Sequence, residues 1–482
     1  MSAAEQVQAY EEVLARYGRV LDFDISGLDR LGVPVTSCSL LRDGRLAHHG
    51  NGYGATAEAA RLSGLGELAE GILAAAHVAA LRRSARRGSY AQLVAAEGAD
   101  RVADPATLCL PAGSAWTPAS PLTWVPVERL RTGETVWAPL DLVASGPAEL
   151  DGQGAWGAEG LVLPVTNGLG AGLDPARPVA HGIGEILQRH TNGLRFRALD
   201  ARSPEIAAAG LPASVAALVE EFRAAGVEPV LKHAATAYGV CSTYVMGLDA
   251  DDRTPVRLTA CGEAADPSAE RSLLKALLEY ANSRSRKTFC FGRPDAAQAV
   301  GDPAYWAALP PGGAGAEPRA LAAMRDWHAL GADGLRSLTA PDRSRTTAYA
   351  DVVVPGTPAD LTTPADQLAH LIDALAGHDV LVARTRVGEV QVAKTLVPGL
   401  EVETLSYGRI GELNARESLE ADLGLVQLRD GPTASHPDRV VLSAAAEERL
   451  GGRAWYAYAR AAEIVGPLYP LYREPPRHAV AV

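Results

Sequence analysis

Three segments of the sequence place acidic side chains at helical spacing directly after glycine-containing runs. In residues 166–190, His181, Glu185 and Gln188 are spaced i, i+4 and i+7, so they would share one face of a helix. The same three positions recur in two other segments, as Ser63, Glu67 and Glu70 and as Lys275, Glu279 and Asn282. Each predicted helix therefore presents a carboxylate with a polar neighbour one turn away.

Taken singly, each of these patterns is also typical of an ordinary helix face in contact with solvent. Glu67, Glu185 and Glu279, however, lie in segments rich in Ala, Gly and Leu, with few of the Lys partners that solvated Glu-rich helices carry at i+4. Glycine-rich runs such as residues 168–172 let the backbone approach a ligand closely. The repetition therefore favours three helices whose acidic faces meet at one site.

Acidic side chains that converge need a cation, because like charges repel. At ~4 Å and an effective dielectric constant of ~20, each pair of carboxylates costs about 4 kcal/mol. Carboxylate and amide oxygens suit Mg²⁺, which typically takes one or two carboxylates and completes its shell with water and phosphate. The pattern therefore predicts Mg²⁺ ions that hold a nucleoside triphosphate, with Arg189 and Arg284 on the phosphate oxygens.

Other routes to nucleotide chemistry and other partners find little support. There is no G-x-x-x-x-G-K-[ST] loop, no pair of protein-kinase motifs and no strand-linked G-x-G-x-x-G. The five cysteines are widely spaced without a C-x-x-C pair, which predicts buried free thiols. A net charge of −12 argues against nucleic acid as a partner. No apolar run approaches the ~20 residues of a membrane span, and residues 1–18 are too charged for a signal peptide, so we expect a cytoplasmic protein without a membrane partner.

The elements that must position these side chains alternate between helix and strand. Thr56 is the predicted N-cap of a helix over residues 56–81, which follows a hairpin that turns at Asp43 and Gly44. Further helices are predicted at residues 4–17, 90–96, 211–225, 364–376 and 444–449. Strands are predicted at residues 35–41, 45–49, 194–198, 227–235, 239–249, 379–384 and 389–397, with two more within 122–139. The Pro- and Gly-rich residues 303–318 are expected to form a linker or an exposed excursion.

A set of short blocks, in this order and spacing, resembles the YcaO family over most of the chain. The blocks are GLDRLGVPV, GNGYGAT, SGLGELAEG, TNGLGAGLDPARPVAHGIGEILQR, LLKALLEYANSR and KTLVPGLE. The resemblance implies an α/β (α+β) fold of the YcaO type, with mixed sheets and helices surrounding a central ATP/Mg pocket. We accordingly divide the chain into an N-terminal extension (1–30), an ATP- and Mg²⁺-binding core (31–300), a Pro/Gly-rich excursion (301–345) and a C-terminal part with a tail (346–482).

The resemblance also implies the metal ligands, carried over to the matching positions of this sequence. Glu67, Glu70 and Glu185 would bind Mg²⁺ directly. Gln188 stands where many members have a second Glu, so it would bind the metal more weakly or through water.

The nucleotide contacts follow from the same blocks. The implied set is Ser63, Arg189, Asn282, Arg284 and Glu279, the last on either the metal or the nucleotide. Arg189 and Arg284 would also act in catalysis. His181 has two interpretations, a base near the reacting amide or a packed histidine that bonds the preceding turn.

Members of the family use ATP to phosphorylate a backbone amide oxygen after a nucleophile has attacked the carbonyl carbon. The nucleophile is a Cys, Ser or Thr side chain, an amino terminus, or sulfide, which gives an azoline, a macroamidine or a thioamide. We expect cyclodehydration of a ribosomally made precursor peptide. Macroamidine formation, thioamidation and a non-catalytic peptide-binding scaffold are the alternatives.

The end of the chain bears on the partners. Residues 475–482 do not match the alternating prolines with which azoline-forming members often end. The chain resembles the stand-alone type, which binds the precursor peptide directly or relies on a separate leader-binding or partner protein. The residues leave open whether the chain forms a homodimer.

Overall fold

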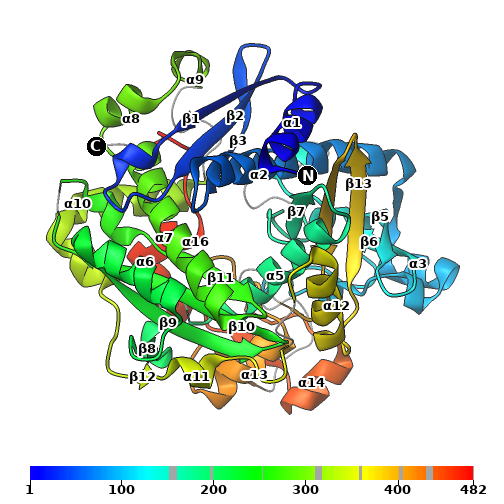
Figure 1. Ribbon diagram of the computed structural model, residues 1–482. Helices are drawn as coiled ribbons and strands as arrows, with labels where there is room; N and C mark the ends of the chain where they lie inside the picture. The colour runs from blue at the N-terminus through cyan, green and yellow to red at the C-terminus, as the bar shows by residue number, and fades with distance from the viewer. Residues whose placement is uncertain are drawn as a thin grey trace.

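Three sheets and the helices that follow them are arranged around the middle of the molecule (Figure 1). The structure, a computed structural model, describes residues 1–150, 160–195, 199–251, 253–309, 317–357, 361–400, 405–429 and 438–480. Antiparallel pairing dominates the sheets, and helices connect them. The α/β (α+β) class predicted from the sequence, with mixed sheets and helices, is confirmed.

The first sheet is an antiparallel hairpin with one added strand. Its strands, in order, are β1 (Arg19–Asp24), β2 (Val35–Arg42) and β3 (Arg45–Tyr53). The hairpin turns at Asp43 and Gly44, as predicted, and both residues have positive φ (51° and 73°). A left-handed conformation suits Gly at no steric cost and is tolerated by Asp, so the Asp-Gly pair fixes where the hairpin turns.

Helix α2 (Ala57–Leu81) begins directly after β3. The Thr56 hydroxyl accepts a hydrogen bond from the Ala59 N–H, which confirms the predicted N-cap. Gly52 of β3 lies so near this helix that a Cβ atom would come within 2.0 Å of the Ala60 carbonyl oxygen. Only glycine therefore allows the strand and helix to approach this closely.

The second sheet repeats this arrangement of edge strand and helix. Its strands, in order, are β4 (Arg86–Ser89), β5 (Pro121–Arg129), β13 (Leu381–Val387), β14 (Val390–Leu396) and β7 (Leu169–Gly172), with β6 (Thr135–Pro139) beside β5. Helix α5 (Ala176–Asn192) follows β7. A Cβ atom on Gly170 would come within 2.2 Å of the Pro178 carbonyl oxygen, so this approach also requires glycine.

The third sheet also has an edge strand that is followed by a helix. Its strands, in order, are β11 (Gly262–Asp266), β10 (Val240–Asp249), β9 (Val227–Ala237), β8 (Glu205–Ile206) and β12 (Thr346–Thr347). Helix α7 (Ala269–Phe291) follows β11, and a Cβ atom on Gly262 would lie 2.1 Å from the Ala276 carbonyl oxygen. The strands β3, β7 and β11 are each at an edge of their sheet, so three edges and three helices face the middle of the molecule (Figure 1).

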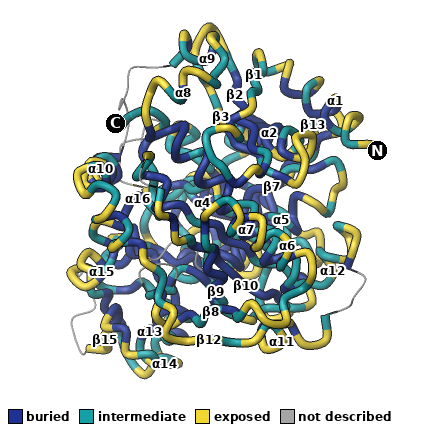
Figure 2. Tube along the Cα trace, turned by 60° about the vertical axis from the view of Figure 1, so that its left-hand side comes forward, coloured by how far each residue is buried: buried dark blue, intermediate teal, exposed yellow. Residues whose placement is uncertain are grey.

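The remaining elements cover this arrangement, and their outward faces are exposed (Figure 2). The other helices are α1 (Ala3–Leu14), α3 (Tyr90–Glu97), α4 (Leu140–Val143), α6 (Ala213–Ala224), α8 (Pro294–Val300), α9 (Pro303–Ala308), α10 (Pro318–Thr339), α11 (Tyr349–Val352), α12 (Pro364–Ala374), α13 (Glu412–Glu420), α14 (Ala444–Leu450), α15 (Tyr458–Val465) and α16 (Tyr469–Tyr472). A small sheet joins β15 (Val426–Leu428) and β16 (Ala454–Tyr456).

Two local expectations from the sequence are contradicted in the residues that the structure describes. The stretch 303–318, expected as a linker or exposed excursion, begins with α9, whose Tyr305 is fully buried against Phe289; residues 310–316 lie outside the described residues. The strand expected at 194–198 is also not formed where it can be seen, because Leu194 and Arg195 lie in a turn and 196–198 are outside the described residues. One hydrophobic cluster contains Leu21, Phe289 and Trp327, so distant parts of the chain share a core. The division into four ranges stays a prediction.

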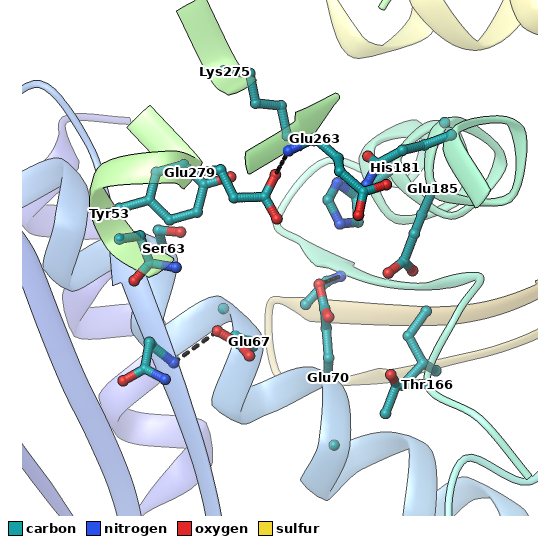
Figure 3. A pocket seen from close by; sticks show the side chains of 18 of the residues that line it. Tyr53, Ser63, Glu67, Glu70, Thr166, His181, Glu185, Glu263, Lys275 and Glu279 are labelled. Atoms are coloured by element: carbon teal, nitrogen blue, oxygen red, sulfur yellow. Dashed lines mark hydrogen bonds between the residues drawn. The ribbon is translucent and has the colours of Figure 1, made fainter. Parts of the chain in front are cut away.

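Helix α2 corrects the expectation that no apolar run is long enough to cross a membrane. Within the described part of the chain, Ala57–Ser84 is long and apolar enough to cross a membrane by length and composition. In the structure this helix packs against β2, β3 and α1 and buries Leu65, Leu68 and Ile72. It also carries Glu67 and Glu70, which line a pocket (Figure 3). Its apolar length therefore serves the protein core.

Candidate functional site

A cavity of about 1710 Å³ lies where the three edge strands and their helices meet. We call it the central cavity; its walls come from β3, β7 and β11, from α2, α5 and α7, and from the C-terminal residues 471–477. Nearly all the predicted site residues line it, namely Ser63, Glu67, Glu70, His181, Glu185, Gln188, Arg189, Glu279 and Asn282. The three sequence patterns are therefore brought together in space (Figure 3).

One carboxylate on each helix is held in the same way. The Oε2 atom of Glu67 accepts a hydrogen bond from the Asn51 N–H at 2.7 Å, and Glu185 Oε2 accepts one from the Gly168 N–H at 2.9 Å. Glu279 Oε2 accepts one from the Glu263 N–H at 3.0 Å. Each donor lies at or beside the edge strand that precedes the helix. One oxygen of each carboxylate is thereby fixed, which orients the other.

Glu70 joins two of the three units. Its Oε1 accepts a hydrogen bond from the Ala171 N–H of β7 at 3.0 Å, although Glu70 itself is on α2. Burial, followed by the charges of Glu185 and Glu67, raises the pKa of Glu70 to about 8. Burial and the neighbouring Glu263 raise the pKa of Glu279 to about 7. These carboxylates therefore gain from a cation placed between them.

The donor set fits Mg²⁺ that is shared with a phosphate ligand. Within the described ranges, no group of three His, Cys, Asp or Glu side chains is close enough to hold a metal ion alone. That spacing suits Mg²⁺, which usually takes one or two carboxylates and keeps positions for water and phosphate. Two neutral oxygen acceptors also belong to the cavity lining. Asn51 Oδ1 and Asn282 Oδ1 are buried there without a hydrogen-bond partner among the described residues. Glu67, Glu70, Glu185 and Gln188, the predicted metal ligands, all line this cavity.

Cationic side chains line other parts of the central cavity. An Arg189 N–H donates to the Glu263 carboxylate at 3.1 Å, and Glu263 also accepts from Asn192 at 2.9 Å. Arg286 and Lys287, on α7, both pair with Glu474 of the C-terminal segment. Sequence reasoning missed Glu263, Arg286 and Lys287. The helical spacing contained a signal for Arg286, because it is seven residues after Glu279 and so returns to the same face.

The predicted role of Arg284 needs correction, because its side chain points away from the central cavity. Its guanidinium is fully buried and donates to Asp29 at 2.7 and 2.8 Å and to Asp249 at 2.8 Å. Arg284 is not among the residues that line the central cavity. An α-helix turns by about 100° per residue, so a residue five positions after Glu279 points about 140° away from it. The expected nucleotide contact and catalytic role do not fit this position.

His181 lines the central cavity on α5, one turn before Glu185. Burial, followed by the charges of Lys275 and Arg177, lowers the pKa of His181 to about 3. The imidazole is therefore neutral near pH 7 and, without a bound anion, has little affinity for a proton. Its placement suits a hydrogen bond to a ligand better than service as a strong base.

The C-terminal segment is the largest omission from the sequence analysis. The chain end does not have alternating prolines, yet Arg473, Glu474 and Arg477 line the central cavity. Arg477 donates to the Ser37 hydroxyl at 3.0 Å and to the Gly50 carbonyl oxygen at 3.1 Å. The side chain of His478, the next residue, packs among aromatic rings and is bonded to the Tyr305 hydroxyl at 2.8 Å. The segment is therefore an anchored wall of the site.

Fold and site together define an α/β protein whose central cavity pairs converging carboxylates with cations, as a site for a metal-bound nucleotide requires. The description "YcaO cyclodehydratase, ATP- and Mg²⁺-binding" belongs to the family model that matches residues 51–401. The chain belongs to this YcaO family, whose cofactors are ATP and Mg²⁺.

Individual relatives agree with this assignment. An uncharacterized protein of Methanothermobacter thermautotrophicus is 30% identical over 290 residues, which cover 58% of this chain and 69% of that protein. The structure of YcaO from Methanopyrus kandleri bound with AMPPCP and Mg²⁺ has a TM-score of 0.57 at 19% identity, covering 85% of this chain and 94% of that one. A heterocyclase in complex with substrate and cofactor has a TM-score of 0.59 at 18% identity, covering 86% of this chain and 54% of that one. At these identities the two structures show a shared fold.

Proposed function

We propose that this chain uses ATP and Mg²⁺ to activate a backbone amide of a ribosomally made precursor peptide and closes a Cys, Ser or Thr side chain into an azoline. The family description and the fold shared with a heterocyclase support this proposal. The observation that carries it is the meeting of Glu67, Glu185 and Glu279 in one cavity, each oriented by a backbone N–H. A separate protein that delivers the peptide is compatible with the proposal.

We assign the residues of the central cavity to metal binding or to nucleotide binding. Glu67, Glu70 and Glu185, with Gln188, would hold Mg²⁺, and Glu279 would contact the metal or the nucleotide. Ser63, Arg189 and Asn282 would contact the nucleotide. When bound, ATP with Mg²⁺ supplies an electrophilic phosphoryl group and absorbs developing negative charge. Arg286 and Lys287 are placed to neutralise phosphate oxygens in the role first expected of Arg284.

The proposed reaction balances without an oxidant or reductant. The side-chain oxygen or sulfur of the peptide bonds to the carbonyl carbon and loses its proton. The former carbonyl oxygen takes the terminal phosphoryl group from ATP and then leaves as phosphate, while the amide nitrogen loses its proton and forms the ring C=N bond. The products are the azoline peptide, ADP and phosphate. Phosphorylation matters because it converts a poor leaving group into a good one.

The size of the central cavity leaves room for the peptide. Pockets for small molecules are typically ~300–1,000 Å³, whereas this cavity measures about 1710 Å³. The lining also includes apolar side chains such as Leu173 and Leu371. A nucleotide and a short peptide segment can therefore occupy the cavity together, as an amide-activating reaction requires.

The direct test is mass spectrometry of the precursor peptide encoded beside this gene after incubation with the protein, ATP and Mg²⁺. The proposal predicts loss of one water per ring together with loss of a free Cys, Ser or Thr side chain. Water loss that consumes the amino terminus would point to a macroamidine, and exchange of oxygen for sulfur in the presence of sulfide would point to a thioamide. Either result would refute azoline formation.

A matched pair of variants separates an enzyme from a scaffold. Glu185→Gln keeps the size of the side chain but removes a proposed metal ligand, so product formation should fall at least about 100-fold. Glu220→Gln alters an exposed carboxylate that pairs with Arg223, away from the central cavity, and should leave the rate unchanged. Equal product formation with the two variants, in the presence of the partner proteins, would instead identify a non-catalytic scaffold.

A further inference from the structure

Two cations lie behind the metal-site carboxylates, each on the far side of a single peptide group. The Nζ atom of Lys394 donates to the Asn167 carbonyl oxygen at 2.7 Å. The N–H of the next residue, Gly168, donates to Glu185 Oε2 at 2.9 Å. The carbonyl of Asn167 and the N–H of Gly168 belong to the same rigid peptide unit. Lys394 and Glu185 are therefore hydrogen-bonded to opposite ends of one peptide group.

The same arrangement occurs behind Glu67. Arg477 donates to the Gly50 carbonyl oxygen at 3.1 Å, and the Asn51 N–H of the same peptide unit donates to Glu67 Oε2 at 2.7 Å. The two cations come from unrelated parts of the chain, since Lys394 is on β14 and Arg477 is in the C-terminal segment. Their matching contacts are thus independent observations.

We propose that Lys394 and Arg477 are positioning residues, which fix the peptide groups 167–168 and 50–51 and thereby orient Glu185 and Glu67 for Mg²⁺. The inference rests on the metal role given to these two carboxylates under the proposed function. Neither cation touches the metal or the substrate in this assignment. Each acts on its carboxylate only through the peptide group between them.

The physical basis is the alignment of charges and dipoles. A cation at the carbonyl end and a carboxylate at the N–H end both favour the same orientation of the peptide dipole, and such chains of hydrogen bonds strengthen one another. With Oε2 of each carboxylate bonded to the backbone, Oε1 is the oxygen left to bind a ligand in the central cavity that Glu67 and Glu185 line. Second-shell contacts of this kind usually set the geometry of metal ligands.

Packing alone does not explain Lys394. Lys394 is 4% exposed, and lysine is rarely buried so deeply unless its charge is paired. The ammonium group donates to Val165 O at 2.5 Å as well as to Asn167 O, so it closes the loop that leads into β7. An apolar side chain would fill this space without the cost of burying a charge. The two carbonyl contacts therefore account for a lysine at this position.

Arg477 is held in place by its neighbours in the chain. Three residues earlier, Glu474 pairs with Arg286 and Lys287. His478 is bonded to Tyr305 and lies 4.8 Å from the ring of Trp306, measured between ring centroids. The segment is thus fixed on both sides of Arg477, so its guanidinium can act as a support for the β2–β3 hairpin.

The third carboxylate provides an internal control. The peptide group that serves Glu279 joins Gly262 to Glu263, and it lies in β11, which is paired along its length with β10. Strand pairing fixes this peptide group without a hydrogen bond from Lys394 or Arg477, whereas the peptide group 50–51, although β3 is likewise paired with β2, also accepts one from Arg477. Losing Lys394 or Arg477 should therefore leave the backbone around Glu263 undisturbed.

The test combines hydrogen exchange in the metal-free protein with titration of Mg²⁺ in the presence of a non-hydrolysable ATP analogue. Lys394→Met should raise amide exchange at residues 165–168, and Arg477→Gln should raise it at 50–51, each without affecting the other segment or residues 262–264. Each variant should weaken Mg²⁺ binding about 10-fold or more, as is typical for loss of a second-shell partner. Arg477→Lys, which keeps a donor cation, should recover most of the affinity.

Controls distinguish positioning from general destabilisation. Lys232→Met removes another buried lysine, which pairs with Asp200 and donates to Asp342 O, and Arg202→Gln removes an arginine that donates to Ala421 O. Both should leave Mg²⁺ affinity unchanged. If Lys394→Met does not fold, Arg477→Gln and Arg477→Lys carry the test by themselves.

Mg²⁺ affinities within twofold of wild type in the Arg477→Gln protein, or a uniform rise in exchange along the chain, would overturn the assignment. If instead the proposed function is wrong, a different result is expected. In that case the wild-type protein would leave the peptide mass unchanged, while the dependence of Mg²⁺ binding on Lys394 and Arg477 could still be measured.

Discussion

At the scale of single residues, the site depends on the angle at which each side chain leaves its helix. On α7, Glu279 and Asn282 line the central cavity, and so does Arg286, whereas Arg284 points into a buried ion-pair network. Two arginines only two positions apart therefore have different tasks. Arg284 ties Asp29 and Asp249 together, and Arg286 contributes charge to the site.

Substitution of these two arginines should separate stability from nucleotide binding. Arg284→Gln leaves Asp29 and Asp249 without their buried partner, so it should lower the free energy of unfolding by about 3–5 kcal/mol. Arg286→Gln removes a cation from the cavity wall, so it should weaken nucleotide binding about 10-fold, the effect of roughly 1.4 kcal/mol. Urea unfolding and calorimetry with an ATP analogue measure the two quantities. Weaker nucleotide binding by folded Arg284→Gln protein than by Arg286→Gln protein would contradict this division.

The carboxylates were predictable from the sequence, whereas their partners were not. The i, i+4 and i+7 spacing is local, so it identified Glu67, Glu185 and Glu279 and the faces they share. Helical phase also held enough information to exclude Arg284 and include Arg286. The backbone donors Asn51, Gly168 and Glu263 carry no side-chain signal, because any residue can supply an N–H.

At the scale of elements, three strand–helix pairs are each joined at a glycine. Gly52, Gly170 and Gly262 lie on the edge strands, and a Cβ atom at any of them would lie within 2.2 Å of a backbone atom of the helix that follows. These contacts cannot be relieved by rotating a side chain. The close approach also lets backbone N–H groups at or beside each strand reach the helix carboxylate.

Gly262→Ala should therefore damage both stability and the site. A Cβ atom there would meet the Ala276 carbonyl oxygen at 2.1 Å, so overpacking should cost about 1–3 kcal/mol or more of unfolding free energy. It should also shift the Glu263 N–H that holds Glu279, and so weaken Mg²⁺ binding. Gly27→Ala is the control, since nothing lies within 4 Å of a Cβ atom at that position. Equal melting temperatures for the two variants would contradict the argument.

Element prediction succeeded where the signals were local. The Asp43-Gly44 turn and the Thr56 cap are set by the residues themselves. The strand expected at residues 194–198 is not formed at Leu194, which lies in a turn; residues 196–198 are outside the described residues. The order of strands within the three sheets depends on contacts between distant segments, such as β7 with β14, and has no local signal.

At the scale of the whole molecule, segments near both ends of the chain hold α7 in place. The C-terminal segment lines the central cavity, and Asp29 near the N-terminus anchors α7 through Arg284. Burial opposes ionisation of Glu474, but the positive charges of Arg286 and Lys287 hold its pKa at about 2. The ionised carboxylate thus fastens the segment to α7.

This pairing predicts a dependence of stability on pH. Because the folded pKa of Glu474 is lowered from 4.5 to about 2, its contribution is present above about pH 4.5 and is lost as the pH falls toward 2. Glu474→Gln should lower the free energy of unfolding at pH 7 by at most about 3 kcal/mol. The gap from wild type should narrow progressively below pH 4.5 in urea unfolding experiments. A gap that is the same at pH 7 and at pH 3 would rule out this role for the carboxylate.

The place of the C-terminal segment could not be read from the sequence. The run Glu474-Pro475-Pro476-Arg477 lacks the alternating prolines that would have marked it, and its contacts are with residues far away in the chain, such as Ser37 and Lys287. Pairing between charges that are far apart in the sequence leaves no regular spacing from which it could be predicted. Only the folded chain shows that these residues share a cavity with Glu67.

The most direct test of the central claim is a crystal structure of the protein with Mn²⁺, in place of Mg²⁺, and a non-hydrolysable ATP analogue. Anomalous scattering would locate the metal ions independently of the rest of the density. We predict metal ions in the central cavity that bridge the triphosphate to carboxylate oxygens of Glu67, Glu70 and Glu185, with Glu279 beside them. Metal and nucleotide bound elsewhere, or bound in the cavity without contact to carboxylates from at least two of α2, α5 and α7, would contradict the account.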